Sequence, residues 1–396
     1  MRNRPRVAEG FSILEMTVAM GIMLAVTATM FSLLHPSEGA FAVEPEAADM
    51  QQRIRVAADT LTRHLMMAGA GPYQTARAAP LVYHFAPVLP FRRGTSNDDP
   101  PGTFDPGAIT IAYVPSTPAQ STLASNGPDA SHSDVSIGLD PGCPVGDAAC
   151  GFTAGMTALL YDDHGNADVF SVASVVAGGR LVLRQSDRTP PFDRYLAGST
   201  RITEAVNRVY SLKTDAAAGT YQLTVRDGPG GNEVPVVDHV VALSFEYFGD
   251  PRPPRASRPL SDPDGPWTTY GPKPDMVPFD AYAAGENCVF VNDGLAVPSP
   301  RLPDLGGADA ALVPLTAAQL TDGPWCPNAS SPHRWDADLL RIRRIAVTLR
   351  VQAANAALRG PAGALFAHGG SSRGGKWLPD YELHMQVAPR NLNLGR

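Results

Sequence analysis

The stretch GFSILEMTVAMGIMLAVTATMFSLL, residues 10–34, decides how this chain is organised. From Phe11 onward it is an apolar run whose single charged residue is Glu15. As a helix, 24 residues at about 1.5 Å each would reach about 36 Å, and the hydrocarbon core of a bilayer is about 30 Å thick. We therefore predict a transmembrane helix over residues 11–34.

The head of the chain, residues 1–10, is short and basic. It carries Arg2, Arg4 and Arg6 against one acid, Glu9. Basic residues that flank a membrane span stay on the cytoplasmic side. The sequence therefore predicts a single-pass protein whose C-terminal part crosses the membrane.

Glu15 needs an explanation of its own, because an ionised carboxylate inside a membrane span costs about 2.5 to 3.5 kcal/mol near the helix centre, and less near the interface. A charge in such a place usually has a partner. Cleavage between Gly10 and Phe11 would create one, since the new amino group of Phe11 could meet the Glu15 carboxylate of a neighbouring subunit.

The order of Gly10, Phe11 and Glu15 ahead of an unbroken apolar run resembles the class III signal of type IV pilins and type II secretion pseudopilins. The resemblance implies that residues 1–10 are a prepilin leader peptide, that a prepilin peptidase cuts after Gly10 and methylates Phe11, and that Glu15 guides assembly. It also implies four kinds of partner: other pilin or pseudopilin subunits, the peptidase, an inner-membrane assembly platform and membrane lipid. The location expected is the inner membrane with a periplasmic C-terminal domain, and a pilus or pseudopilus after assembly.

Two other interpretations of this segment stay open. One is an ordinary secretory signal peptide, for which Ala40, Phe41 and Ala42 offer a cleavage site. The other is a plain membrane anchor. The apolar cores of signal peptides run about 7 to 15 residues, so the span here is too long for the first interpretation.

A second helix is predicted over residues 46–69, after a break marked by Pro36, Gly39 and Pro45. Gly69 and Gly71 should end it. Its apolar residues recur every three or four positions and so share one face: Ala47, Met50, Ile54, Ala57, Leu61, Leu65 and Ala68. The resemblance implies that this segment continues the membrane helix and packs against a sheet.

The whole chain has 37 Gly and 38 Pro, which favour strands joined by turns and loops. We therefore predict an antiparallel β domain over residues 70–396, periplasmic according to the resemblance. Alternating apolar residues predict strands at 220–225, 345–351 and 382–387. Hairpins are expected at Leu159 to Val172, through residues 162–166, and at Val169 to Leu183, through Gly178 and Gly179.

Three patches, residues 237–247, 340–349 and 387–392, are similar to PilW-type minor pilins and J-type pseudopilins. A Pro-rich insertion at 251–338 departs from that pattern. The predicted fold class is α+β and pilin-like: a long N-terminal helix, with a membrane half and an amphipathic half, packed on an antiparallel sheet with long loop insertions.

All four cysteines follow the membrane span, where disulfides persist in an exported domain. The simplest pairing joins Cys143 to Cys150 and Cys288 to Cys326. Zinc is the alternative ligand of four thiolates, but the chain has no CxxC spacing.

Other functional classes find little support in the sequence. The formal charge of −7 argues against nucleic acid as a partner. We predict no catalytic site, metal or cofactor. Calcium is an alternative use of two acidic groups whose residue types are also standard in turns: Asp162, Asp163, Asn166 and Asp168, and separately Asp262 and Asp264.

The function expected from these observations is structural: a minor pilin-like subunit near the tip of a type IV pilus or in the initiation of its assembly. A pseudopilin of a type II secretion system is the alternative within the same class. A membrane-anchored binding protein or adhesin, whose insertion holds the ligand site, is the alternative from another class.

Overall fold

The structure is a computed structural model. It describes residues 10–72, 80–94, 105–128, 133–162, 165–184, 195–215, 217, 219–228, 231–258, 267, 271–274, 276–278, 281–306, 311–331, 334–372 and 377–394, with the backbone alone for 33–42. The chain forms two compact units. One is Met1–Gln52 with Gln352–Asp380, and the other is Arg53–Val351 with Tyr381–Arg396.

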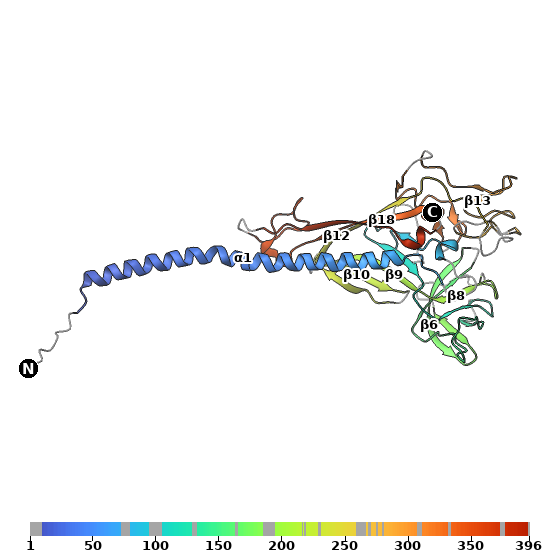
Figure 1. Cartoon of the computed structure of the whole chain (residues 1–396), viewed down its shortest axis with the longest axis horizontal. Helices are drawn as coiled ribbons and strands as arrows, with labels where there is room; N and C mark the ends of the chain where they lie inside the picture. Colours follow the sequence, from blue (N-terminus) through green and yellow to red (C-terminus); the bar gives the residue numbers. More distant parts are fainter. Residues whose placement is uncertain are drawn as a thin grey trace, which may run out of the picture. The chain divides into compact units, whose positions relative to one another are not determined.

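One α-helix, α1 (Ile13–Met67), covers both predicted helical segments (Figure 1). The break expected at Pro36, Gly39 and Pro45 does not occur. Starting a helix is the costly step and extending it is not, so a helix already formed on both sides can continue through residues of low helix propensity. The expected end is confirmed, because α1 stops at Met67 and Gly69 adopts a left-handed φ of 79°.

The predicted fold class is wrong, because the fold is β-rich rather than a pilin-like long helix packed on a sheet. The described residues contain nineteen strands and one α-helix, and the strands form separate sheets of five, four, six, two and two. Alternation of apolar residues reveals single strands but does not say which strands pair. The single sheet that we predicted therefore corresponds to several.

The five-stranded and four-stranded sheets are antiparallel throughout. In spatial order the first contains β1 (Val88–Pro90), β2 (Ile109–Tyr113), β9 (Val206–Asp215), β10 (Thr220–Asp227) and β11 (Val234–Asp238). The second contains β15 (Val313–Leu315), β12 (Val240–Gly249), β18 (Ile342–Val351) and β19 (Tyr381–Val387). The strands predicted at 220–225, 345–351 and 382–387 are confirmed as β10, β18 and β19.

The run 237–247 is divided between two sheets. Strand β11 ends at Asp238 and β12 begins at Val240, and His239 between them has a φ of 61°. A positive φ is uncommon for a residue other than glycine, and it breaks the extended backbone that one continuous strand would need.

The six-stranded sheet contains both predicted hairpins. Its order is β3 (Gln120–Thr122), β8 (Arg201–Glu204), β5 (Thr157–Tyr161), β6 (Ala167–Val176), β7 (Arg180–Arg184) and β4 (Asp134–Ser136). Leu159 lies opposite Val169, and β6 turns into β7 at Gly178 and Gly179, both with positive φ. One face of this sheet covers an apolar core that includes Leu160, Phe170 and Ile202.

The insertion 251–338 consists mainly of loops in its described part. Its short strands are β13 (Phe290–Val291), β14 (Ser299–Pro300), β15, β16 (Trp325–Cys326) and β17 (Trp335–Asp336). The 3₁₀ helix η2 (Ala337–Arg341) follows, and three more such turns are η1 (Leu81–Tyr83), η3 (Ala356–Leu358) and η4 (Arg390–Leu392).

Within the larger unit, the last turns of α1 contact two strands. Ala57, Leu61 and Leu65 are fully buried. The Thr62 hydroxyl lies 3.5 Å from the sulfur of Met385 on β19, and His64 contacts Tyr210 on β9.

Candidate functional site

Gly10, Phe11 and Glu15 lie around the first turn of α1, and Ser12 caps that turn. The Ser12 amide donates to Glu15 Oε2 at 3.1 Å, and the Glu15 amide donates to Ser12 Oγ at 3.1 Å. The Ser12 hydroxyl also lies 3.2 Å from the same carboxylate oxygen. This reciprocal pair is a capping box, which satisfies two amide groups that a helix start leaves without partners.

This capping role of Glu15 was not predicted from the sequence. The signal was present, because a serine followed three residues later by a glutamate ahead of an apolar run marks a helix start. A carboxylate in the first turn also interacts favourably with the positive end of the helix dipole. Glu15 therefore has a local reason to be in the apolar segment, besides the docking role predicted for it.

The segment Ile13–Ser32 is long and apolar enough to cross a membrane, and none of it is buried within the protein. Phe11 is 88% exposed and Leu14 is 74% exposed. Such an exposed apolar surface is what a membrane anchor or a signal sequence near an N-terminus presents. The arginines and Glu9 of the predicted leader lie outside the described residues.

Cleavage after Gly10 and methylation of Phe11 stay predictions. Gly10 precedes the helix, and a Cβ atom added to it would meet nothing within 4 Å. The alternative cleavage site at Ala40, Phe41 and Ala42 lies inside α1, where the backbone is helical.

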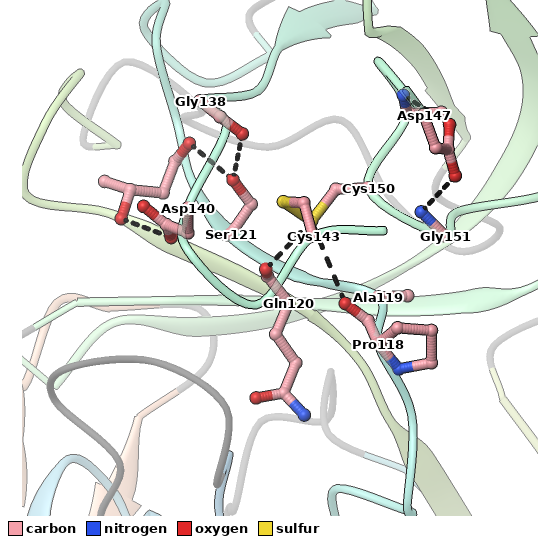
Figure 2. The surroundings of a disulfide bond; sticks show 12 residues. Pro118, Ala119, Gln120, Ser121, Gly138, Asp140, Cys143, Asp147, Cys150 and Gly151 are labelled. Atoms are coloured by element: carbon pink, nitrogen blue, oxygen red, sulfur yellow. Dashed lines mark hydrogen bonds between the residues drawn. A yellow bond between two sulfur atoms is a disulfide. The ribbon is translucent and has the colours of Figure 1, made fainter. Parts of the chain in front are cut away.

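Both predicted disulfides are present. Cys143 is bonded to Cys150 and Cys288 to Cys326, so no cysteine is free for zinc. In the first loop, Asp147 accepts from the amide of Gly151 at 2.7 Å (Figure 2). Two disulfides after an apolar N-terminal helix point to an extracytoplasmic domain.

The residues considered for calcium make turn and core contacts. Asp162 Oδ1 accepts from the Asn166 amide at 3.0 Å, and Asp168 accepts from the Tyr195 hydroxyl at 2.7 Å. Asp163, Asp262 and Asp264 lie outside the described residues. Over the part of the chain that the structure describes, no group of three or more His, Cys, Asp or Glu side chains is placed to hold a metal ion.

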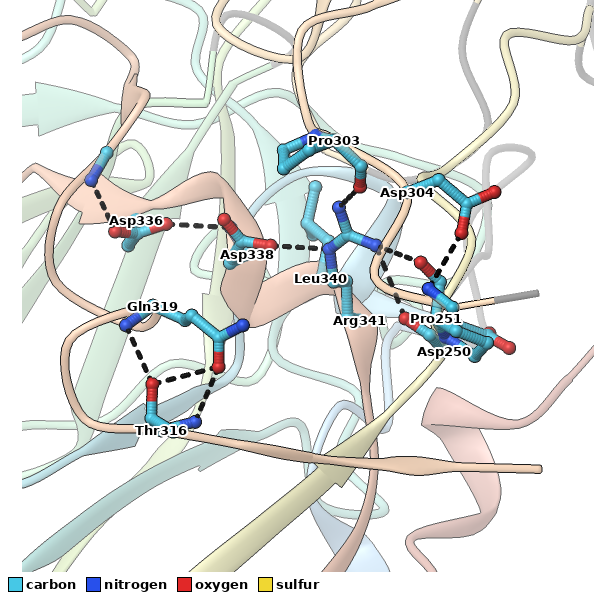
Figure 3. A network of polar contacts seen from close by, with 12 residues as sticks. Asp250, Pro251, Pro303, Asp304, Thr316, Gln319, Asp336, Asp338, Leu340 and Arg341 are labelled. Atoms are coloured by element: carbon cyan, nitrogen blue, oxygen red, sulfur yellow. Dashed lines mark hydrogen bonds and ion pairs between the residues drawn. The ribbon is translucent and has the colours of Figure 1, made fainter. Parts of the chain in front are cut away.

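A buried polar network at the end of the insertion was not predicted (Figure 3). Arg341 is fully buried, and it pairs with Asp338. Its guanidinium also donates to the carbonyl oxygens of Asp250, at 3.3 Å, and Pro251, at 2.9 Å. Because those acceptors belong to the backbone, they leave no signature in the sequence. The Arg341 guanidinium thereby joins the start of the insertion to its end.

Two carboxyl groups of this network have raised pKa values. Burial raises the pKa of Asp336 to about 7, although the amides of Asp338 and Gly323 donate to its oxygens. Burial likewise raises the pKa of Asp338 to about 6, and Arg341 opposes part of that effect. Both groups change charge near neutral pH.

A second polar cluster connects the last turn of α1 to the five-stranded sheet. His64 contacts the Tyr210 hydroxyl and the Arg208 guanidinium, which in turn pairs with Asp227 at 2.6 Å. Burial and the Arg208 charge lower the pKa of His64 to about 4, so its imidazole is neutral at pH 7. The cluster joins α1 to β9 and β10, and the His64 imidazole takes part in it as an uncharged group.

Comparisons of this chain with protein family models, curated proteins and solved structures give no match.

Proposed function

We propose that this chain is a minor pilin-like subunit of a type IV pilus, placed near the tip or acting when assembly begins. In this proposal the subunit is made in the inner membrane, with its disulfide-bonded domain in the periplasm. Its role is structural, and its partners are other subunits, the peptidase, the assembly platform and membrane lipid. The observation that carries the proposal is the order of Gly10, Phe11 and Glu15 at the start of an exposed apolar helix.

The exposed apolar surface of α1 supports the proposal because it must be covered in the cell. Lipid covers it before assembly, and the helices of neighbouring subunits would cover it inside a fibre. A plain membrane anchor needs only the lipid. Since the capping box already gives Glu15 a use in a plain anchor, an experiment has to separate capping from docking.

Processing is the first test. Removal of residues 1–10 takes away three arginines and one glutamate and changes the formal charge from −7 to −9. Mass spectrometry of the mature chain should find an N-terminus at a methylated Phe11. A mature N-terminus at Val43 would show ordinary secretion instead and would refute the proposal.

The sharper test compares three variants in sheared fibres and in membranes. Glu15→Ala removes both the cap and the charge, Glu15→Gln keeps a capping side chain but removes the charge, and Ser12→Ala removes half of the cap. Loss of one partner of a buried ion pair costs roughly 3 to 5 kcal/mol, whereas loss of a cap costs about 0.5 to 2 kcal/mol.

We expect both Glu15 variants to be cleaved and to remain in the membrane, but to be absent or strongly depleted from fibres. Ser12→Ala should still assemble, because it keeps the carboxylate. Normal incorporation of Glu15→Gln would mean that the charge has no docking role and that Glu15 is a helix cap alone.

A pseudopilin of a type II secretion system is the second candidate, because the same N-terminal segment serves both kinds of fibre. A deletion strain separates the two. Loss of pilus-dependent motility with normal protein secretion would support the minor pilin, and the opposite result would support the pseudopilin.

A further inference from the structure

The six-stranded sheet carries a cavity of about 270 Å³ beside its edge strand, β3. The cavity belongs wholly to the larger unit. Its lining mixes polar and apolar surface, and its polar side chains include Gln120, Thr122, Asp140, Ser199, Arg201 and Thr203. Pockets for drug-sized molecules measure about 300 to 1,000 Å³ and are mostly apolar, so this cavity suits a smaller and more polar molecule.

The register of the strands explains why polar groups gather here. Thr122 on β3 lies opposite Arg201 on β8, which lies opposite Tyr161 on β5. Because side chains alternate along a strand, these three share one face of the sheet. Ile202, one position along β8, belongs to the apolar core on the other face.

Arg201 supplies a cation to this cavity. Its side chain is 7% exposed, and the guanidinium carbon lies 5.7 Å from the centre of the Tyr161 ring. One guanidinium nitrogen lies 3.0 Å from Nε2 of His84. An arginine stays protonated at any physiological pH, and its fork of donors matches a carboxylate.

Hydroxyl groups and one acid complete the lining. Asp140 Oδ2 lies 3.3 Å from the Thr122 hydroxyl, and Ser199 lies on the segment that leads into β8. Hydroxyls both donate and accept, and a carboxylate accepts from a ligand hydroxyl. The lining therefore offers one cationic contact and several contacts suited to hydroxyl groups.

The Cys143–Cys150 disulfide lies close to Gln120 and Asp140 (Figure 2), and both of these residues line the cavity. The Cys143 amide donates to the carbonyl oxygen of Asp140 at 2.9 Å. Cys150 Sγ lies 3.3 Å from the carbonyl oxygen of Gln120 on β3. The segment that carries Asp140 is thus tied to the strand that carries Thr122.

We propose that this cavity binds a small polyhydroxylated carboxylate, of the size and chemistry of a hexuronic acid. The Arg201 guanidinium receives the carboxylate, and Thr122, Asp140 and Ser199 contact the hydroxyls. The exposed ring of Pro141 and the ring of Pro72 supply the apolar surface that a sugar ring requires, and the buried Tyr161 ring lies under the Arg201 guanidinium. This binding is separate from the proposed role of α1 in assembly, and it gives the larger unit a ligand.

The test uses the full-length oxidised chain in lauryldimethylamine oxide micelles, because that detergent contains no sugar. Ligand-observed NMR titrations measure the dissociation constants of glucuronate, glucose and acetate. We expect glucuronate to bind at least tenfold more tightly than either of the others. Equal binding of glucose would refute the role of the cation, equal binding of acetate would refute recognition of the hydroxyls, and no binding of glucuronate would refute the site.

Variants test the assignment of residues. Arg201→Gln should weaken glucuronate binding about ten- to hundredfold, because it removes a charge-assisted contact. Arg201→Lys should recover part of the loss. The matched control is Arg180→Gln on the exposed part of β7, which should leave the affinity unchanged. Unchanged binding by a folded Arg201→Gln protein would overturn the proposal.

A third variant keeps the test decisive if Arg201→Gln fails to fold, as judged by its thermal unfolding and by formation of the Cys143–Cys150 bond. Thr122→Val has nearly the same shape and lacks only the hydroxyl. It should weaken glucuronate binding about two- to tenfold. No change in this variant would mean that glucuronate binds elsewhere.

Discussion

Replacement of Asp336 by asparagine should change how the stability of the larger unit depends on pH. The Asp336 side chain has no exposed surface, and it accepts from the amides of Gly323 at 2.7 Å and Asp338 at 2.8 Å. Burial raises its pKa from 3.8 to about 7. Asparagine has a similar size, but it cannot ionise.

The size of the effect follows from the pKa. One pKa unit corresponds to about 1.36 kcal/mol, so the ionised form of Asp336 costs the folded state on the order of 4 kcal/mol above pH 7. The pKa is raised in the folded state, so the stability that this group contributes is complete below pH 3.8 and is lost as the pH rises through 7. Between pH 5 and pH 8 the loss amounts to about 2.6 kcal/mol.

Other groups also titrate in this range. The lowered pKa of His64, about 4, has the opposite effect, because stability is lost as the pH falls from 6.5 toward 4. Asp338, whose pKa is about 6, acts in the same direction as Asp336. Both are present in the wild type and in Asp336→Asn, so the contribution of His64 cancels in the difference, which reports Asp336 together with its electrostatic coupling to Asp338.

The assay is urea-induced unfolding of the full-length oxidised chain in micelles, followed by tryptophan fluorescence. Trp335, next to the substituted residue, is 3% exposed and reports on this region. Loss of one accepted hydrogen bond should shift the free energy of unfolding of Asp336→Asn by about 1 to 3 kcal/mol at every pH. On top of that offset, the variant should gain about 2.6 kcal/mol relative to the wild type between pH 5 and pH 8. A difference that stays constant over this range would refute the reasoning.

Two further predictions concern stability and use the same urea assay. Replacement of Cys288 and Cys326 by serine should lower the free energy of unfolding by about 4 kcal/mol, because their bond closes a loop with a sequence separation of 38; a loss below about 1 kcal/mol would contradict the chain-entropy argument. Gly249→Ala should cost about 1 to 3 kcal/mol, because its new Cβ would lie 2.6 Å from the backbone oxygen of Arg341. The control is Gly363→Ala, whose Cβ meets nothing within 4 Å and which should cost nothing measurable; equal losses in the two variants would contradict the steric argument.

Individual strands could be predicted from the sequence, and the arrangement of the sheets could not. β10, β18 and β19 each alternate apolar and polar residues, and the hairpins have turn residues at fixed places. Short sequence separation also made the disulfide pairing predictable. In contrast, Ile109 on β2 pairs with Tyr210 on β9, about a hundred residues later. No local pattern encodes such a pairing, because many apolar strands of similar length compete for it.

The candidate sites differ in the same way. The capping box lies within four residues and was visible in the sequence, although only one role of Glu15 was recognised. The cavity on the six-stranded sheet combines Thr122, Arg201 and Tyr161 from three strands, so it appears only when the register is known. Arg341 is harder still to predict, because backbone carbonyl oxygens supply most of its acceptors.

The geometry of the first turn allows Glu15 to be a cap and a docking residue at once. Both bonds from Ser12 end on one carboxylate oxygen, Oε2, and the other oxygen, Oε1, makes no hydrogen bond to any described residue. If cleavage occurs after Gly10, the new amine of Phe11 carries a positive charge at the positive end of the helix dipole, which is unfavourable. A carboxylate from a neighbouring subunit would offset that repulsion while its Oε2 still caps its own helix. Capping would then hold the Glu15 side chain in one orientation before assembly, so that less conformational entropy is lost when the subunits meet.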